Sequence, residues 1–494
     1  MSPNKKSVRR KTLYAFPDTL RYRAGRYSVN IAFLLCLNGS EKGFLYALYL
    51  YTCGNIFGII IILKFMSIWQ RILFFVIVFG ILFGLQFLTY ITFHRFLKRK
   101  NLTGKFWNAI SIYPYILFLL PFIYILIART KLTDLPGWFY DIYIIPFFVF
   151  QAAVFFIGLF LLVGKIIKSP FSIANFVLSK IRYTREKLED FKKKKAVVKF
   201  DDSRRQFITA SAVLVSGYAF IGAGTGVLKK DDYEITYREI KINNLPHELK
   251  GFTITLVSDF HCGPFMEEDL LKDYCDVIND INSDLILIPG DLTNSDKSEA
   301  VSFANAFRNL KAKHGVYASL GNHDYFSDPN YISDVLKNES PIKLLRNDSE
   351  VVQVNGNGLC IMGVEDTRGS GASYDEVVMG YFNETISKTK ENLQNRKLNY
   401  ENVTKILLYH KPYLFPDIKN DKIDLMLSGH THGGQIVLAK FGNVNLSIAA
   451  SVSRYISGLY KEGDSQMYVS RGVGVVGLPI RLNCPPEITK ITLV

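Results

Sequence analysis

Long runs without a charged side chain dominate the first third of the chain. Four such runs are Gly43–Leu63, Ile72–Phe93, Phe106–Ala128 and Ile142–Gly164. At about 1.5 Å per residue, a helix over any of these runs crosses the roughly 30 Å hydrocarbon layer of a membrane. Helices at the surface of a soluble protein keep one polar face, and these runs have none. The pattern therefore predicts an all-α membrane domain over residues 43–164.

A fifth apolar run, Gln206–Leu228, is richer in Gly, Ala and Ser than the other four. It follows Ser203-Arg204-Arg205-Gln206-Phe207-Ile208, which resembles a twin-arginine export signal, where paired arginines precede a mildly apolar stretch. Two arginines flanking an ordinary fifth transmembrane helix are the alternative interpretation. Both interpretations keep residues 206–228 in the membrane unless a signal peptidase removes them, so we expect about five transmembrane helices.

The basic residues are concentrated in the same half of the chain as the apolar runs. Residues 1–230 contain 33 Lys and Arg against 9 Asp and Glu, whereas residues 231–494 contain 26 against 35. The net charge of +15 therefore follows the membrane-like half. This distribution favours contact with a lipid bilayer and argues against a nucleic-acid partner.

The Lys and Arg counts of the connecting segments predict the orientation in the membrane. These segments and their counts are the N-terminal 42 residues with nine, 64–71 with two, 94–105 with five, 129–141 with two and 165–205 with thirteen. The positive-inside rule places the basic N-terminus 1–42 and the basic linker 165–205 in the cytoplasm. We therefore expect a multi-pass protein of the cell's inner membrane whose last domain, residues 232–494, is extracytoplasmic.

From about Asp232 the pattern changes to short aliphatic runs that alternate with amphipathic stretches, which is typical of an α/β domain. The expected strands are Gly251–Val257, Asp284–Ile288, Gly315–Leu320, Ile406–Tyr409 and Ile423–Leu427. Helices are expected over about 267–281 and 299–313. Polar residues follow every one of these strands, and ligands of open α/β sheets bind at the carboxyl ends of strands. We expect the five polar clusters to converge on one sheet edge.

Five of the eight histidines lie in these clusters, together with two aspartates and an asparagine. They are His261, His323, His410, His430 and His432, with Asp259, Asp291 and Asn322. Imidazole and carboxylate together favour Zn, Fe or Mn over the all-oxygen shells of Ca and Mg. The set is large enough for two divalent ions that share a carboxylate.

In chain order, the clusters resemble the five-part signature of calcineurin-like metallophosphoesterases over about residues 250–435. The matching motifs are Asp259-x-His261, Gly290-Asp291, Gly321-Asn322-His323-Asp324, His410 and Gly429-His430-x-His432. The resemblance implies a β-sandwich flanked by helices and a dinuclear centre that holds two divalent ions, Mn, Fe or Zn. It implies one ion on Asp259, His261 and His432, a second on Asn322, His410 and His430, and a bridge by Asp291.

The same resemblance implies roles beside the metals. His323 corresponds to a histidine at the leaving group, where it acts as general acid or stabilises developing charge. Asp324 holds the His323 ring in one tautomer or, alternatively, only shapes the turn. Asn322 and Arg471 are the expected substrate contacts, with Arg471 as a bidentate phosphate donor. Packing at the domain edge is the alternative for Arg471.

The C-terminal residues 470–474, 477–481 and 483–487 resemble a membrane-associated bacterial branch of the family. That branch includes twin-arginine-exported phosphoesterases and UDP-2,3-diacylglucosamine pyrophosphatases. We expect a membrane-anchored phosphoesterase that cleaves a phosphate monoester, diester or pyrophosphate in a phosphorylated small molecule, lipid or envelope polymer. The twin-arginine export machinery is a further partner if the signal is used. Two alternatives are a cytoplasm-facing UDP-2,3-diacylglucosamine pyrophosphatase and a non-catalytic membrane sensor or transporter subunit.

Overall fold

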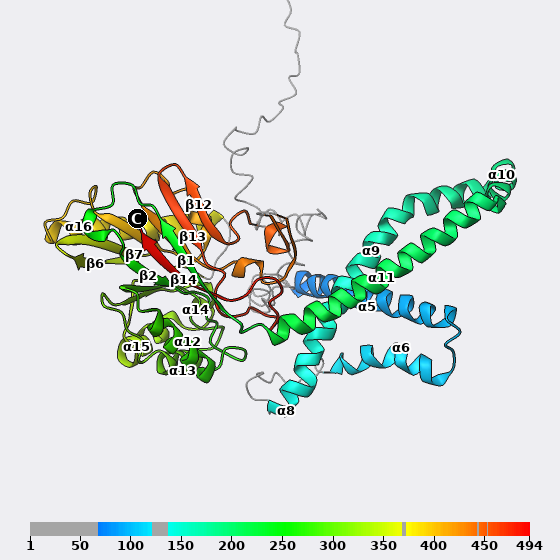
Figure 1. Ribbon diagram of the computed structural model, residues 1–494, viewed down its shortest axis with the longest axis horizontal. Helices are drawn as coiled ribbons and strands as arrows, with labels where there is room; N and C mark the ends of the chain where they lie inside the picture. The colour runs from blue at the N-terminus through cyan, green and yellow to red at the C-terminus, as the bar shows by residue number, and fades with distance from the viewer. Residues whose placement is uncertain (1–67, 121–136, 368–371, 442–443, 452) are drawn as a thin grey trace, which may run out of the picture.

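The computed structural model describes residues 68–120, 137–367, 372–441, 444–451 and 453–494. These residues form a group of long helices and an α/β domain, which meet along one side (Figure 1). The helices come from the half of the chain that contains the charge-free runs. The α/β domain comes from the half that contains the polar clusters.

The helical part is built around one long helix that packs against two others. Its elements are α5 (Ile68–Arg99), α6 (Lys105–Leu117), α8 (Gly137–Phe139), the π-helical turn η2 (Tyr140–Ile144), α9 (Ile145–Lys180), α10 (Arg182–Lys193) and α11 (Lys195–Leu228). Helix α9 packs against both α5 and α11. Between apolar faces, Gln86 Nε2 donates to Gln151 Oε1 at 2.5 Å, and Gln151 Nε2 donates to the Phe118 carbonyl at 3.0 Å. These bonds satisfy polar groups that lipid could not.

Two helical stretches, Asp141–Lys180 and Lys195–Leu228, are long and apolar enough to cross a membrane. They contain the fourth and fifth predicted runs. The expectation of about five spans is therefore corrected to two for the described residues. The first run lies outside these residues, and the third is described only as far as residue 120. Helix α6, which begins the third run, ends at Leu117, and the second run lies in α5, which is not one of the two.

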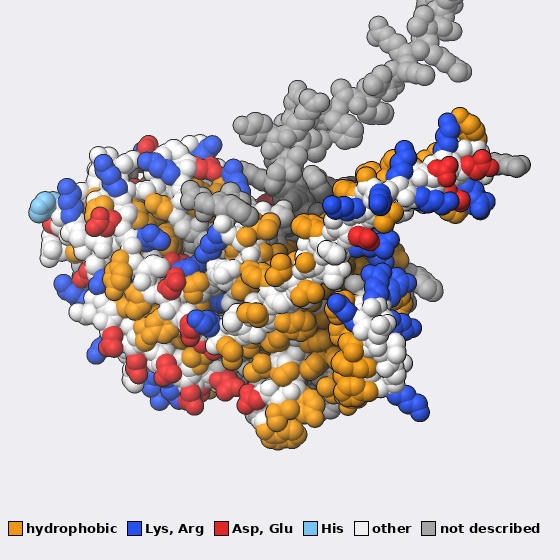
Figure 2. Space-filling model, turned by 45° about the vertical axis from the view of Figure 1, so that its right-hand side comes forward, with side chains coloured by type: hydrophobic (Ala, Val, Ile, Leu, Met, Phe, Trp, Pro, Cys, Tyr) orange, Lys and Arg blue, Asp and Glu red, His pale blue; other side chains and the backbone are white. Residues whose placement is uncertain are grey.

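The predicted basic linker 165–205 is largely helical. It consists of the distal part of α9, all of α10 and the start of α11, which together form a hairpin that projects away from the α/β domain (Figure 1). Figure 2 shows Lys and Arg side chains along this hairpin, and a broad apolar surface over the helices nearer to the α/β domain. Arg204, in the predicted export motif, pairs with Asp201 one turn earlier at 2.9 Å.

The α/β domain contains two six-stranded sheets. The first sheet has the order β1 (Glu234–Ile240), β14 (Glu487–Leu493), β2 (Thr253–Leu256), β3 (Leu285–Pro289), β4 (Val316–Ser319) and β5 (Ile342–Leu344). The second has the order β12 (Gly458–Glu462), β13 (Ser465–Val469), β9 (Leu425–Ser428), β8 (Thr404–Leu408), β7 (Asn357–Gly363) and β6 (Asp348–Val354). A small hairpin of β10 (Val437–Phe441) and β11 (Val444–Ser447) lies outside both.

Alternation along the strands divides the core into layers. In β3, Leu285 and Leu287 belong to the cluster between the two sheets, whereas Ile286 and Ile288 belong to the cluster under the helices. Successive side chains of a strand point to opposite faces, so a strand covered on both sides is apolar throughout. This is why β3 is a continuous apolar run in the sequence.

Helices cover both outer faces of the sandwich. The first sheet is covered by α12 (Glu268–Ile281), α13 (Glu299–Ala306) and α15 (Pro329–Glu339), with the short α14 (Asn322–Phe326) after β4, and α16 (Ala372–Asn395) packs on the second sheet. The expected β-sandwich flanked by helices is confirmed. The expectation of one sheet edge is wrong, because β2, β3 and β4 lie in one sheet while β8 and β9 lie in the other.

Candidate metal centre

The polar clusters of the two sheets meet at one end of the sandwich. The loops after β2 and β3 run side by side, because the Asp259 N–H donates to the Gly290 carbonyl at 3.2 Å and the His261 N–H to the Asp291 carbonyl at 3.1 Å. His410 connects the sheets, since its Nδ1–H donates to the carbonyl of Pro289 at 2.8 Å. That bond fixes the tautomer that leaves Nε2 of His410 facing the centre.

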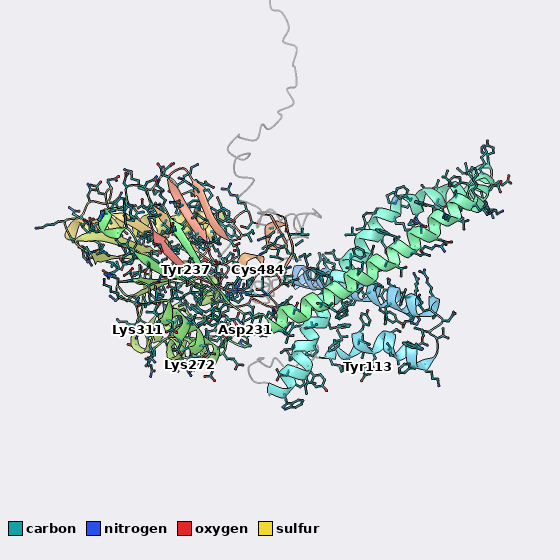
Figure 3. All side chains as sticks on the ribbon, viewed as in Figure 1. Tyr113, Asp231, Tyr237, Lys272, Lys311 and Cys484 are labelled. Atoms are coloured by element: carbon teal, nitrogen blue, oxygen red, sulfur yellow. The ribbon has the colours of Figure 1, made fainter. Side chains whose placement is uncertain are left out.

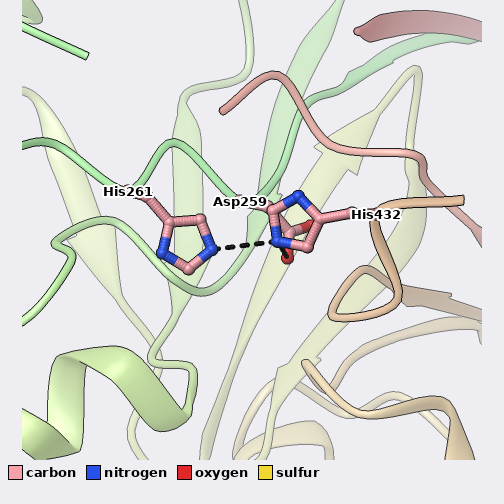
Figure 4. Close-up of side chains that lie close together, drawn as sticks. All are labelled: Asp259, His261 and His432. Atoms are coloured by element: carbon pink, nitrogen blue, oxygen red, sulfur yellow. Dashed lines mark hydrogen bonds and ion pairs between the residues drawn. The ribbon is translucent and has the colours of Figure 1, made fainter. Parts of the chain in front are cut away.

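One group of three buried side chains can hold a cation. Asp259, His261 and His432 place their ligand atoms within 4.8 Å of one another. The two Nε2 atoms of His261 and His432 are 3.0 Å apart, and Asp259 Oδ1 is 3.4 Å from His432 Nε2 (Figure 4). Two facing ring nitrogens and a carboxylate oxygen are a donor set that suits a transition-metal ion or zinc.

A second set of groups surrounds Asp291. The ligand atoms of Asp291, His410 and His430 lie within 4.8 Å of one another, as do those of His261, Asp291 and His323. Asp291 Oδ2 is 2.9 Å from His410 Nε2 and 3.5 Å from His261 Nε2. Asp291 thus lies between the histidines of both groups, as a bridging carboxylate would.

An unpartnered buried atom also fits a bound cation. Asn322 Oδ1 is buried and has no hydrogen-bond partner among the described residues. A buried polar atom without a partner costs free energy, and a metal ligand is one of the few reasons to keep an amide oxygen in that state. The side chains present therefore fit a metal centre.

The backbone is strained at the candidate ligands themselves. Positive φ angles between 48° and 74° occur at five of the candidate ligands, Asp259, His261, Asp291, His430 and His432. Such angles are uncommon outside glycine and cluster at functional sites. Neighbouring glycines make room, because a Cβ at Gly321 would overlap the carboxylate of Asp291 and one at Gly429 that of Asp259. The loops are shaped to bring the carboxylates into close contact with neighbouring backbone.

The pKa values of the two buried carboxylates shift in opposite directions. Burial raises the pKa of Asp259 to about 6, against the opposing effect of His410. Burial also acts to raise the pKa of Asp291, but His410 and His323 hold it well below its usual range. For His410 burial acts to lower the pKa, yet the adjacent Asp291 raises it to about 10.

The pKa values of His261 and His432 are well below the ordinary value, chiefly because burial disfavours the charged ring. For His432 the nearby guanidinium of Arg481 adds to this effect. Neutral imidazole is the form that binds metals. The centre therefore holds both rings ready as ligands.

His323 lies beside the candidate ligands. Its ring meets that of His261 edge-on at 4.5 Å, and its backbone N–H donates to Asp291 Oδ1 at 2.8 Å. Its Nδ1–H donates to the carbonyl of Asn294 at 2.6 Å. Asn294 therefore does what was expected of Asp324, and the ring-orienting interpretation of Asp324 is wrong.

Asp324 instead organises the backbone under the centre. Its buried carboxylate accepts hydrogen bonds from the N–H groups of Leu292, Thr293 and Gly321 and from the Thr293 hydroxyl, at 2.9–3.2 Å. The loops after β3 and β4 are tied together by this one side chain. The alternative role in shaping the turn fits these contacts.

The contacts of two arginines near the C-terminus differ from the expectation. Arg471 pairs with Glu487 at 3.2 Å and Glu234 at 2.9 Å, which supports its packing at the domain edge rather than its phosphate contact. Arg481, to which the sequence assigned no role, is 3% exposed, and its Nη2 lies 3.4 Å from His432 Nδ1. The only sequence signal for it is its place in the 477–481 motif.

Comparison with known proteins gives the same result as the geometry. A family model described as calcineurin-like phosphoesterase matches residues 252–434. An uncharacterized metallophosphoesterase of Bacillus subtilis, YkuE, is 30% identical over 297 residues, which cover 59% of this chain and 97% of that protein. An uncharacterized metallophosphoesterase of Aquifex aeolicus is 32% identical over 287 residues, which cover 57% of this chain and 97% of that protein.

A relative from Danio rerio is named a transmembrane protein with metallophosphoesterase domain. It is 30% identical over 266 residues, which cover 52% of this chain and 56% of the relative. The chain thus spans little more than half of that relative's length. The name of this relative thus describes a metallophosphoesterase domain within a transmembrane protein.

Replacing Asp291 with Asn is expected to lower the number of Mn²⁺ ions bound by the full chain by at least one. The amide keeps the size of the side chain but loses the negative charge that offsets repulsion between neighbouring cations. Metal analysis after equilibrium dialysis measures the stoichiometry, with Asp276→Asn on the exposed side of α12 as the control. Native stoichiometry in Asp291→Asn would contradict the central place of this carboxylate.

Proposed function

The chain belongs to the calcineurin-like phosphoesterase family, and on that premise we propose that it is a membrane-anchored phosphoesterase with two divalent ions. Metal-dependent hydrolysis of a phosphoester follows from the family membership. The two-ion assignment, the anchoring and the substrate class are the proposed parts. The observation that carries the proposal is the convergence of three overlapping ligand groups on the buried carboxylates of Asp259 and Asp291.

We assign the first ion to Asp259, His261 and His432, and the second to Asn322, His410 and His430, with Asp291 between them. The first assignment is supported by the 3.0 Å approach of the His261 and His432 nitrogens. The second is supported by the tautomer of His410 and by the unpartnered oxygen of Asn322. Mn, Fe and Zn all suit a set of imidazole nitrogens and carboxylate oxygens.

When bound, such ions lower the pKa of a water molecule and neutralise phosphate oxygens during in-line attack. The side chains of the protein then have three tasks. Asp259 and Asp291 supply the negative charge, and Asn322 contributes a neutral oxygen that leaves room for an anionic phosphate. His323 presents Nε2 to the leaving group, because its Nδ1 is held by the Asn294 carbonyl. With a proton on Nε2, His323 acts as general acid or stabilises the departing oxygen.

The anchoring proposal rests on helices that the α/β domain contacts directly. Helix α11 passes into β1 within six residues, and its C-terminal turns pack against the domain. The aromatic ring of Phe148 in α9 meets that of Phe265, four residues after His261, at 6.0 Å. Because the centre lies close to the helices, a phosphate in a lipid or envelope molecule at the membrane surface is the substrate class that we propose.

For the topology we propose that the spans Asp141–Lys180 and Lys195–Leu228 flank a cytoplasmic basic hairpin and that the catalytic domain is extracytoplasmic. The thirteen Lys and Arg of residues 165–205 support this orientation. The two helices long enough to span a membrane support the last two crossings. We propose export through Arg204 and Arg205 as one of two routes for the last crossing, the other being ordinary insertion.

The detergent-solubilised full chain is expected to hydrolyse bis(4-nitrophenyl) phosphate or 4-nitrophenyl phosphate when Mn²⁺ is present. A chelator is expected to abolish the activity, and Mn²⁺ in excess to restore it, since the ions supply the nucleophile. Release of nitrophenolate measures the rate. A chain that binds its metals but stays inactive on phosphodiesters, monoesters and pyrophosphates would contradict the proposed function.

His323→Ala is expected to lower turnover roughly 10²–10⁴-fold while leaving the bound metal unchanged. The loss should be smaller for nitrophenyl esters, whose leaving groups need little protonation, than for alkyl esters. Rates over a series of leaving groups, with metal analysis of the same samples, measure both effects. His247→Ala, at an exposed histidine far along the chain from the motifs, is the control. A defect that does not depend on the leaving group would rule out the acid role.

A β-lactamase fused after Val494 is expected to protect an expressing bacterium from ampicillin, because the enzyme works only outside the cytoplasm. The matched control carries the same fusion after Arg205, before the last apolar run, and should give no protection. The ampicillin concentration that each strain survives is the measurement. Protection by the control alone would reverse the proposed orientation.

A further inference from the structure

The last two turns of helix α11 lie directly against residues 478–482 of the C-terminal segment. The N–H of Arg481 donates to the carbonyl of Gly226 at 2.9 Å. Gly226 approaches so closely that a Cβ there would lie 2.7 Å from Ile480 Cγ2 and 3.1 Å from the Arg481 carbonyl. Ala223, Val227 and Ile480 share one apolar cluster with residues of α9. The helix and the 478–482 segment therefore form a close-packed joint.

The 478–482 segment is attached equally firmly to the loops of the metal centre. The guanidinium of Arg481 donates to four backbone carbonyls, at 2.5 Å to Gly474, 2.9 Å to Arg471, 3.1 Å to Gly472 and 3.2 Å to Cys484. The Gly474 N–H in turn donates to the carbonyl of Asp259 at 2.7 Å. One side chain thus connects the joint with helix α11 to the backbone of a candidate ligand.

Arg481 also contacts the ring of His432. Its Nη2 lies 3.4 Å from Nδ1, on the side of the ring opposite to the Nε2 that faces His261. Behind the same histidine, Cys484 Sγ donates to the His432 carbonyl at 3.3 Å. Figure 3 labels Cys484 at the side of the domain that faces the helices. Arg481 and Cys484, which contact His432 from behind, therefore belong to the part of the domain on which α11 packs.

The partners of Arg481 are unusual for a buried cation. Among the described residues, the hydrogen bonds of its guanidinium go to backbone carbonyls and to His432, and none of them goes to a carboxylate. A buried charge is costly unless hydrogen bonds and neighbouring charge offset it. Four carbonyls held at one guanidinium form a rigid connection, because the donor fork is planar.

From these contacts we propose that Arg481 is a positioning residue through which the packing of helix α11 sets the place of His432. The membrane anchor then contributes to the metal affinity of the group formed by Asp259, His261 and His432. The coupling rests on the metal assignment of the proposed function, and it adds a link between membrane helix and metal centre. Outer contacts of this kind typically change metal affinity 10–100-fold.

The test compares two alanine substitutions in the same helix of the full chain. Gly226→Ala adds a Cβ against Ile480 and Arg481, whereas Gly224→Ala adds one with nothing within 4 Å. Both changes raise helix propensity by the same amount, so their difference reports only the contact with the 478–482 segment. Mn²⁺ titration followed by electron paramagnetic resonance counts the ions and their affinities without any need for turnover.

We expect Gly226→Ala to bind one of two Mn²⁺ ions about tenfold more weakly, and the other as in the native chain. Gly224→Ala should match the native chain at both ions. Native affinities in Gly226→Ala, or equal weakening of both ions, would overturn the coupling and leave the proposed function intact. A native chain that binds no Mn²⁺, Fe²⁺ or Zn²⁺ would instead overturn the proposed function together with the coupling.

Arg481→Lys gives an independent arm if Gly226→Ala fails to accumulate. Lysine keeps the positive charge but cannot donate to four carbonyls at once. The same single ion should bind more weakly, and Arg471→Lys, at the neighbouring ion pairs with Glu487 and Glu234, should leave both ions unchanged. Native affinities in Arg481→Lys would show that this guanidinium does not position His432.

Discussion

The catalytic half of the chain depends on keeping two carboxylates, Asp259 and Asp291, buried and close together. Each costs several kcal/mol to remove from water, and each raises the cost of the other. His410 offsets part of this cost at Asp291, and the His430 N–H donates to Asp259 at 2.8 Å. The loop residues with positive φ angles and the glycines packed against the carboxylates serve this arrangement. They bring backbone donors and imidazole rings to both acids. Divalent cations would remove the rest of the repulsion.

The same constraint explains why the domain is a sandwich and not one sheet. His410 and His430 come from the second sheet, and they close the centre over carboxylates that come from the first. A shift of one residue in any of these strands would turn its ligand to the opposite face. The layer of apolar residues between the sheets, with Leu287 and Leu427 fully buried, therefore fixes the register that the chemistry needs.

Much of this centre could be predicted from the sequence, because strand ends and ligand types are local features. The division into two sheets could not, since β3 and β8 are both buried along their whole length and only long-range pairing separates them. Strand β14 closes the first sheet between β1 and β2 although it lies at the far end of the chain. The acceptors that orient His323 and His410 are backbone carbonyls of Asn294 and Pro289, which no side-chain motif reveals. For the same reason the sequence assigns no role to Arg481, whose acceptors are backbone carbonyls.

In the helical half, charge-free runs predict where a membrane can lie but not where a helix ends. Helix α9 has 36 residues and so is about 54 Å long, well beyond the roughly 30 Å hydrocarbon layer. Lys165 and Lys168 end the apolar run without ending the helix, because a charged side chain on a solvated face costs a helix little. Helices α9 and α11 thus continue past the apolar runs as a basic hairpin. The C-terminal end of α11, by contrast, lies against the α/β domain. There Gly226 has no side chain, and its carbonyl accepts a hydrogen bond from the N–H of Arg481. The helix is therefore joined to the catalytic domain by backbone contact rather than by a flexible tether.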